Sequence, residues 1–210
     1  MFLRKEELKA VMAADVPETL KETKDAFILH CAIGCRVGDF QKMTMENVAV
    51  SPEGIPYIHY LPQKTKSTQG DNHEVETPLM RSALEIIKKT GFNLPILRYP
   101  SGKSGYNKKI KQLLEVAGID RKVAVFDEAA GENKYLPLYE VGSSKLARKT
   151  HVDLMNKVQV DLYAAGLHRQ GSKAVQRYTM LEIKDRFALM CVAFGEEQYK
   201  VDDRLEMVSV

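Results

Sequence analysis

Apolar residues recur at helical spacing along most of the chain, and short β-branched segments interrupt them once. Residues 4–15 place Leu8, Val11 and Met12 on one face, which is typical of an amphipathic helix. We expect a second helix that stops at Gly34, because glycine is a common helix terminator. The other segments with helical spacing are 17–34, 36–43, 79–91, 104–119, 142–157, 159–167, 171–180 and 181–197.

The pattern changes in the second quarter of the chain. Residues 47–50, 55–61 and 73–79 are short and rich in β-branched or aromatic side chains, and the breaks between them have turn composition. This arrangement predicts a small antiparallel sheet. Residues 123–141 form either another hairpin or a mobile loop. The predicted fold class is therefore mainly α with a small antiparallel β-sheet (α+β).

Composition narrows the class of protein. The chain has 210 residues, of which 44% are hydrophobic and 28% charged, which excludes disorder along the whole chain and suits one large or two small domains. The net charge of +3 weakly favours a polyanionic partner. The sequence has no apolar run long enough to span a membrane and no signal peptide. We therefore expect a cytoplasmic protein without membrane contacts.

The cysteines give no sign of a disulfide framework or a metal site. Cys31, Cys35 and Cys191 are an odd number in apolar surroundings, which argues against disulfides. Cys31 and Cys35 have a spacing that suits two ligands on a helix, but their flanks predict a buried helix and no further ligands lie nearby. We expect no metal and no cofactor.

Arg36 is the first residue with unusual placement, because it follows the apolar helix end CAIGC and must lie close to the core. Asp39 is within reach across one turn. The pair is either a structural ion pair or a guanidinium that Asp39 holds rigid, so that its fork grips a phosphate or carboxylate. Lys64 and Lys66 lie in a predicted turn, where they are either solvated or deliver an ammonium group into a cleft.

Residues 142–157 combine helical apolar spacing with several cations. Ser143 or Ser144 is a suitable helix cap, and Lys145 and Arg148 share the polar face one turn apart. We expect the opposite face to be buried, with its apolar residues being Leu146, Val152, Leu154 and Met155. Further on, His168 and Tyr178 are not specific signals when each is taken alone.

Taken in chain order, these residues resemble the catalytic domain of tyrosine recombinases, the phage-integrase family. The family's first box, a Gly-x-Arg followed by an acidic residue and a strand, is similar to AIGCRVGDFQKMTMENV; the second is similar to LARKTHVDLM and the third to AAGLHRQGSKAVQRYTM. The resemblance covers residues from about Leu3 to Gly195. In type, the chain resembles integrases of bacterial conjugative or mobilisable transposons.

The resemblance implies cleavage of one DNA strand through a 3′-phosphotyrosine, and rejoining to another strand. Tyr178 corresponds to the nucleophile, and Arg36 and Arg148 correspond to the two arginines that clamp the scissile phosphate. Lys64, with Lys66 as the second choice, corresponds to the hairpin lysine that protonates the leaving 5′-oxygen. The remaining correspondences are His168, which hydrogen-bonds the phosphate, and Asp39, which holds the first arginine.

The sequence departs from the family pattern in two places. Lys145 stands where the family usually has histidine; lysine can clamp and donate a proton but is a poorer base at neutral pH. The spacing from His168 to Tyr178 is one residue longer than expected. In terms of domains, the resemblance implies a catalytic domain over 1–197 and a C-terminal tail over 198–210. A preceding core-binding domain is expected to be absent from this chain.

The expected partner is double-stranded DNA at recombination sites. The full-length protein would form a homo-tetramer on DNA, the isolated domain would be a monomer, and the protein would be nucleoid-associated. Beyond the catalytic residues, the expected DNA contacts are Lys66, Lys103, Lys108, Lys109, Arg169 and Lys173.

Three other functions stay open at this stage. Because Lys145 replaces the usual histidine, the chain is also compatible with a DNA-binding accessory factor or repressor that has the same fold and no catalysis. A type IB topoisomerase shares the chemistry but would relax supercoils without a partner site. A helical protein-interaction module would need none of these residues.

Overall fold

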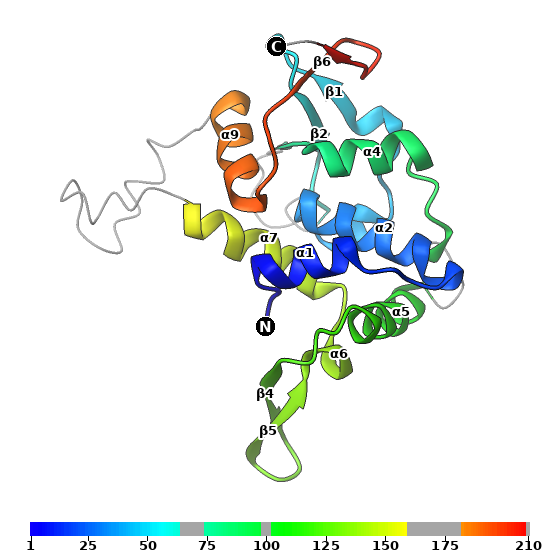
Figure 1. Cartoon of the computed structure of the whole chain (residues 1–210), viewed down its shortest axis with the longest axis vertical. Coiled ribbons are helices and arrows are strands. Elements are labelled where there is room, and N and C mark those ends of the chain that lie inside the picture. The colour runs from blue at the N-terminus through cyan, green and yellow to red at the C-terminus, as the bar shows by residue number, and fades with distance from the viewer. Residues whose placement is uncertain (64–73, 98–101, 159–181, 209–210) are drawn as a thin grey trace, which may run out of the picture.

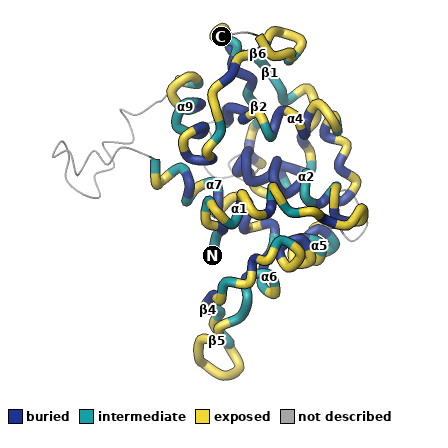
Figure 2. Tube along the Cα trace, viewed as in Figure 1, coloured by how far each residue is buried: buried dark blue, intermediate teal, exposed yellow. Residues whose placement is uncertain are grey.

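The computed structural model describes residues 1–63, 74–97, 102–158 and 182–208. Helix α2 (Glu18–Ile33) runs through the centre of this body, and ten of its 16 residues are buried. Figure 1 shows other helices around it, and Figure 2 shows burial concentrated along it. Its second half is almost continuously apolar from Ala26 to Ile33, so it is buried on more than one side.

Four helices contact α2 directly: α1 (Lys5–Ala13), α4 (Arg81–Thr90), α5 (Gly102–Val116) and α7 (Lys145–Val158). Helix α9 (Ile183–Phe194) packs on α7 and on the sheet. Helices α2, α4 and α9 end at Gly34, Gly91 and Gly195, which all have positive φ. Glycine reaches this left-handed conformation without a Cβ penalty, and the predicted stop at Gly34 is confirmed.

The predicted antiparallel sheet is confirmed. It contains β1 (Val48–Val50), β2 (Pro56–Tyr60) and β3 (Val75–Pro78) in that order, with Tyr60 opposite Val75. The short connecting helices are α3 (Val37–Phe40), η1 (Met45–Asn47), η2 (Pro95–Leu97) and α6 (Leu138–Val141).

Residues 123–141 form mainly a hairpin, so the mobile-loop alternative is wrong. Strands β4 (Lys122–Asp127) and β5 (Glu132–Pro137) pair in antiparallel register and project away from the body (Figure 1). The base of the hairpin is fixed, because the Arg121 guanidinium donates to both carboxylate oxygens of Glu7, at 2.6 and 3.1 Å. Arg121 also donates to the Phe2 carbonyl oxygen at 2.8 Å.

Helix α7 joins distant parts of the chain. The backbone N–H of the fully buried Leu3 donates to Thr150 Oγ1 at 2.9 Å. Leu146 and Leu154 are buried as predicted, but Val152 is 45% exposed. The buried face of this helix is therefore narrower than predicted and does not include Val152.

The C-terminal residues pack on the body of the same chain. Strands β6 (Lys200–Val201) and β7 (Met207–Val208) form a small hairpin, and the N–H of Val201 donates to the Gly54 carbonyl oxygen at 2.8 Å. The Tyr199 hydroxyl donates to the Leu79 carbonyl oxygen at 2.8 Å. Tyr199 belongs to a second small apolar cluster, whose buried members are Ile55, Leu84, Phe187, Cys191, Tyr199 and Val201.

The fold class is mainly α with small antiparallel sheets, as predicted from the sequence. None of the helices in the described part of the chain is long and apolar enough to cross a membrane.

Candidate active site

A cleft of about 430 Å³ lies where three segments begin or meet. Its walls come from the start of α3, the start of α5 and the start of α7, together with Gln63 after β2. The lining residues are Cys35, Arg36, Val37, Gly38, Asp39, Gln63, Lys103, Ser144, Lys145, Arg148 and Lys149. The cleft therefore brings Arg36, from the first box of the sequence, together with Lys145 and Arg148 at the start of α7.

The two arginines are positioned from opposite walls. Arg36 precedes α3 in an extended conformation, two residues after the left-handed Gly34 that ends α2. Arg148 lies one turn into α7, and its Nη1 donates to the Gly34 carbonyl oxygen at 3.2 Å, across 114 residues of sequence. This bond ties the second arginine to the chain segment that carries the first.

His151, one turn after Arg148, strengthens the same junction between α2 and α7. Its Nδ1 lies 3.1 Å from the Cys31 carbonyl oxygen, and because a carbonyl only accepts, Nδ1 must carry the proton. A Cβ atom at Gly34 would lie 2.4 Å from His151 Cγ, so only glycine fits there. Burial lowers the pKa of His151, which keeps the ring neutral near neutral pH.

Five cations line the cleft, namely Arg36, Lys103, Lys145, Arg148 and Lys149. None of them forms an ion pair within 4.0 Å with a carboxylate of the described residues. Each therefore retains N–H donors for a bound anion. A planar guanidinium can offer two of these to one phosphate, so the arrangement suits a phosphodiester.

The expected ion pair between Arg36 and Asp39 is not formed. The Asp39 side chain is buried, and its Oδ1 accepts from the backbone N–H of Gln63 at 3.1 Å. Helix α3 has only four residues and Arg36 is its extended cap, so the regular one-turn geometry on which that expectation rested does not apply. Asp39 instead fixes the end of β2, next to the segment that contains Lys64.

Of the two serines predicted as alternative caps of this helix, Ser143 and Ser144, the hydroxyl of Ser144 does not act as one. Ser144 is 2% exposed, and its hydroxyl has no hydrogen-bond partner among the residues that the structure describes. Its backbone N–H donates to Asn107 Oδ1 of α5 at 2.8 Å. The Asn107 side chain therefore satisfies this N–H, and the Ser144 hydroxyl, which belongs to a residue of the cleft lining, has no partner among the described residues.

Not all of the predicted DNA-contacting residues line this cleft. Lys103 lines the cleft, whereas Lys108 and Lys109 lie further along α5 and do not. The predicted site residues outside the described ranges are Lys64, Lys66, His168, Arg169, Lys173 and Tyr178.

Tyr60, at the end of β2, is a tyrosine close enough to Arg36 and Arg148 to interact with their charges. Burial raises its pKa above the ordinary value, and the charges of Arg148 and Arg36 partly oppose that rise. Its phenol therefore stays protonated at neutral pH. The sequence motifs did not single out Tyr60, because only the folded chain brings the end of β2 to the two arginines.

Metal ligands are not clustered in the described residues, where no group of three His, Cys, Asp or Glu side chains could hold an ion. Cys31 and Cys35 are buried, and burial raises the pKa of both thiols. They act there as small apolar side chains.

No protein-family model and no curated protein matches the sequence. The structure is similar to that of an integrase from mycobacterium phage Brujita, with a TM-score of 0.52 at 16% sequence identity. This chain has the fold of that integrase. The likeness covers 98% of this chain and 61% of the phage integrase, so the chain spans about three-fifths of the protein it matches. It does not distinguish phage integrases from those of conjugative or mobilisable transposons.

Proposed function

We propose that this chain is the catalytic domain of a site-specific DNA recombinase of the tyrosine-recombinase family. The observation that carries the proposal is the convergence of Arg36 and Arg148 in one cleft, where Arg148 bonds to the carbonyl of Gly34. The integrase fold supports it. The finer assignment to a mobile transposon rests on sequence resemblance alone.

In the proposed reaction, Arg36 and Arg148 bind the non-bridging oxygens of the scissile phosphate and stabilise the charge that grows on them. The Tyr178 oxygen attacks phosphorus, the bond to the 5′-oxygen breaks, and Lys64 gives that oxygen a proton. A phenol has a pKa near 10, so Tyr178 must lose its proton as it attacks; Lys145, at the position where the family usually has histidine, is the group in the cleft proposed to take part in that proton transfer. The phosphotyrosine conserves the bond energy, and His168 would hydrogen-bond the phosphate.

The substrate of the proposed enzyme is double-stranded DNA at recombination sites, on which the full-length protein would act as a tetramer. The N-terminal ends of α5 and α7 and the five cleft cations face that substrate. Of the predicted backbone contacts that the structure describes, namely Lys103, Lys108 and Lys109, Lys103 lines the cleft and the other two do not.

The test is covalent trapping on a nicked DNA substrate that loses its 5′ fragment after cleavage. The wild-type chain should form a protein–DNA adduct, and Tyr178→Phe should form none while keeping its circular dichroism spectrum. Tyr60→Phe is the matched control, since Tyr60 lies near the same arginines but should not be the nucleophile. An adduct whose peptide map contains Tyr60 would contradict the assignment.

A second function is favoured by one residue. Lys145 occupies the position at which the family usually has histidine, so the chain could bind the site without cutting it. Specific DNA binding with no adduct on any nicked substrate would establish this accessory role.

A further inference from the structure

The N-terminal end of α7 carries a polar group that the proposed reaction does not use. The Ser144 hydroxyl is buried, has no partner among the described residues, and belongs to a residue that lines the cleft. A buried polar group without a partner destabilises a fold, because it has lost its hydrogen bonds to water and gained none in return. Such groups in native proteins usually have a reason, and a ligand is one of them.

The surroundings of this hydroxyl favour an anion. Ser144 immediately precedes α7, a helix of 14 residues, whose first N–H groups and dipole favour negative charge. Lys103, Lys145 and Lys149 line the same cleft. Among the described residues that line the cleft, Asp39 carries the only carboxylate, and its Oδ1 already accepts a hydrogen bond from the Gln63 N–H.

The backbone at Ser144 is also fixed in place. Asn107 accepts from the Ser144 N–H at 2.8 Å, and Lys103 lies one turn before Asn107 on the same face of α5. One helix thus supplies both a brace for Ser144 and a cation for the cleft. A site that is already ordered binds its ligand with less loss of conformational entropy.

We propose that Ser144 and the N-terminal end of α7, with Lys103, form a second phosphate subsite. It would bind an oxygen of a backbone phosphate next to the one held by Arg36 and Arg148. Ser144 lies four positions before Arg148, which corresponds to a helical rise of about 6 Å. Phosphates of one DNA strand follow one another at about 3.4 Å along the duplex axis, so the two groups are close enough to bind neighbouring phosphates of one strand. This rests on the proposed function for its ligand, DNA, but not for its affinity for phosphate.

The test uses Ser144→Ala, which removes only the hydroxyl, in a Tyr178→Phe background where no covalent chemistry occurs. Binding of inorganic phosphate is followed by NMR shifts of the Lys145 amide, and binding of a short nicked duplex by fluorescence anisotropy. Both affinities should fall about tenfold. Ser143→Ala is the matched control and should change them by less than about twofold.

Thermal unfolding separates this role from a structural one. Because Ser144→Ala removes an unpartnered buried group, the melting temperature should stay the same or rise by about 2–4 °C. A fall of several degrees would show that Ser144 is a helix cap and overturn the proposal, and so would unchanged affinity for phosphate and DNA. If the wild-type chain forms no adduct but Ser144→Ala still weakens phosphate binding, the recombinase assignment fails and the subsite stands.

Discussion

The two ends of helix α7 carry clefts of nearly equal volume, about 430 and 440 Å³. The N-terminal cleft contains the candidate active site. The C-terminal cleft lies between α1, α7 and α9; its apolar lining residues are Phe2, Leu154, Val158, Val192 and Ala193, and its charged residues are Arg4, Lys5, Glu6 and Lys157. Volume therefore does not distinguish the two.

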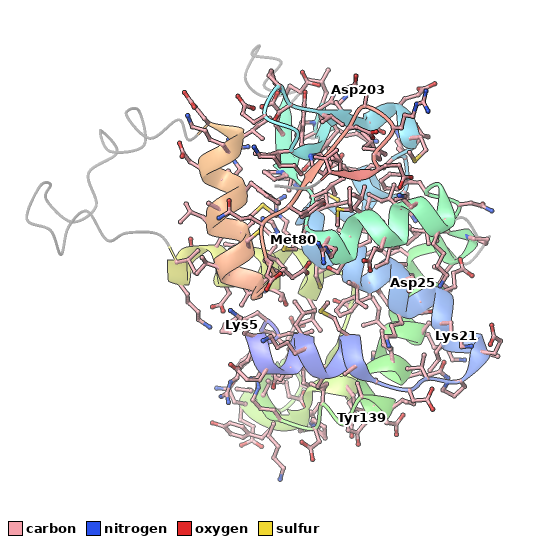
Figure 3. All side chains as sticks on the ribbon, turned by 45° about the horizontal axis from the view of Figure 1, so that its top comes forward. Lys5, Lys21, Asp25, Met80, Tyr139 and Asp203 are labelled. Carbon is pink, nitrogen blue, oxygen red and sulfur yellow. The ribbon has the colours of Figure 1, made fainter. Side chains whose placement is uncertain are left out.

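The state of the cations does distinguish them. In the C-terminal cleft, Lys157 pairs with Asp153 at 2.6 Å and Lys5 donates to the Val192 carbonyl oxygen at 2.8 Å; Figure 3 shows Lys5 near the start of α1. The last carbonyls of α7 also carry partial negative charge. At the other end the helix terminus is positive and the cations have no carboxylate partners among the described residues. The clearest difference is thus Lys157, whose charge is neutralised by Asp153, whereas none of the five N-terminal cleft cations has such a partner in the described part of the chain.

The largest expected difference between the two clefts is catalytic. Arg148→Ala should lower the rate of adduct formation by more than about 100-fold, because one of two guanidinium groups on the phosphate is lost. Lys157→Ala at the opposite end of α7 should change it by less than about twofold. The measurement is single-turnover trapping on the nicked substrate. Equal losses for the two variants would mean that the N-terminal cleft is not special.

A second difference concerns the junction of α2 and α7, which lies beside the N-terminal cleft and holds Arg148 against Gly34. Gly34→Ala should destabilise the fold by about 3 kcal/mol in urea unfolding, since it combines left-handed strain with a clash against His151. Gly118→Ala is the matched control: both glycines have φ of 69°, but nothing lies within 4 Å of a Cβ at Gly118. It should therefore lose only the strain, about 1–2 kcal/mol.

The double variant Gly34→Ala/His151→Ala isolates the clash. If the imidazole is the obstacle, removing it should recover part of the loss, and the two changes should not be additive. Strict additivity would place the cost of Gly34→Ala in the backbone alone.

The smallest expected difference is in the salt dependence of DNA binding. Lys103→Gln in the N-terminal cleft should lower the slope of log affinity against log salt by about 0.9, which corresponds to one phosphate contact. Lys5→Gln in the C-terminal cleft should leave the slope unchanged. A change in slope for Lys5→Gln alone would place the DNA at the wrong end of α7.

Local patterns predicted most of the fold. The helices followed from apolar spacing and glycine stops such as Gly34, and the sheet followed from short segments with turn residues between them. The hairpin at 122–137 was left open, because its exposed faces carry Phe126 and Tyr135, 61% and 68% exposed, and such a strand pair lacks a clear polar face.

The site was predicted less completely. The order of Arg36, Lys145 and Arg148 along the chain carries the resemblance to tyrosine recombinases, and that resemblance was enough to expect these three side chains in one site. The partners of Asp39 and Ser144 were not predictable, because Gln63 and Asn107 come from 24 and 37 residues away and no local pattern encodes those bonds. Lys149 was missed because a basic residue at a helix start usually faces solvent.

The hydrogen bond from Leu3 to Thr150 constrains the order in which the chain can fold during synthesis. The two residues are 147 positions apart, and a ribosome adds about 5–20 residues per second, so roughly 7–30 s pass between their syntheses. During that interval the N–H of Leu3 lacks its final partner. This bond closes only after α7 has been made, so the segment around Leu3 is fixed well after it is translated.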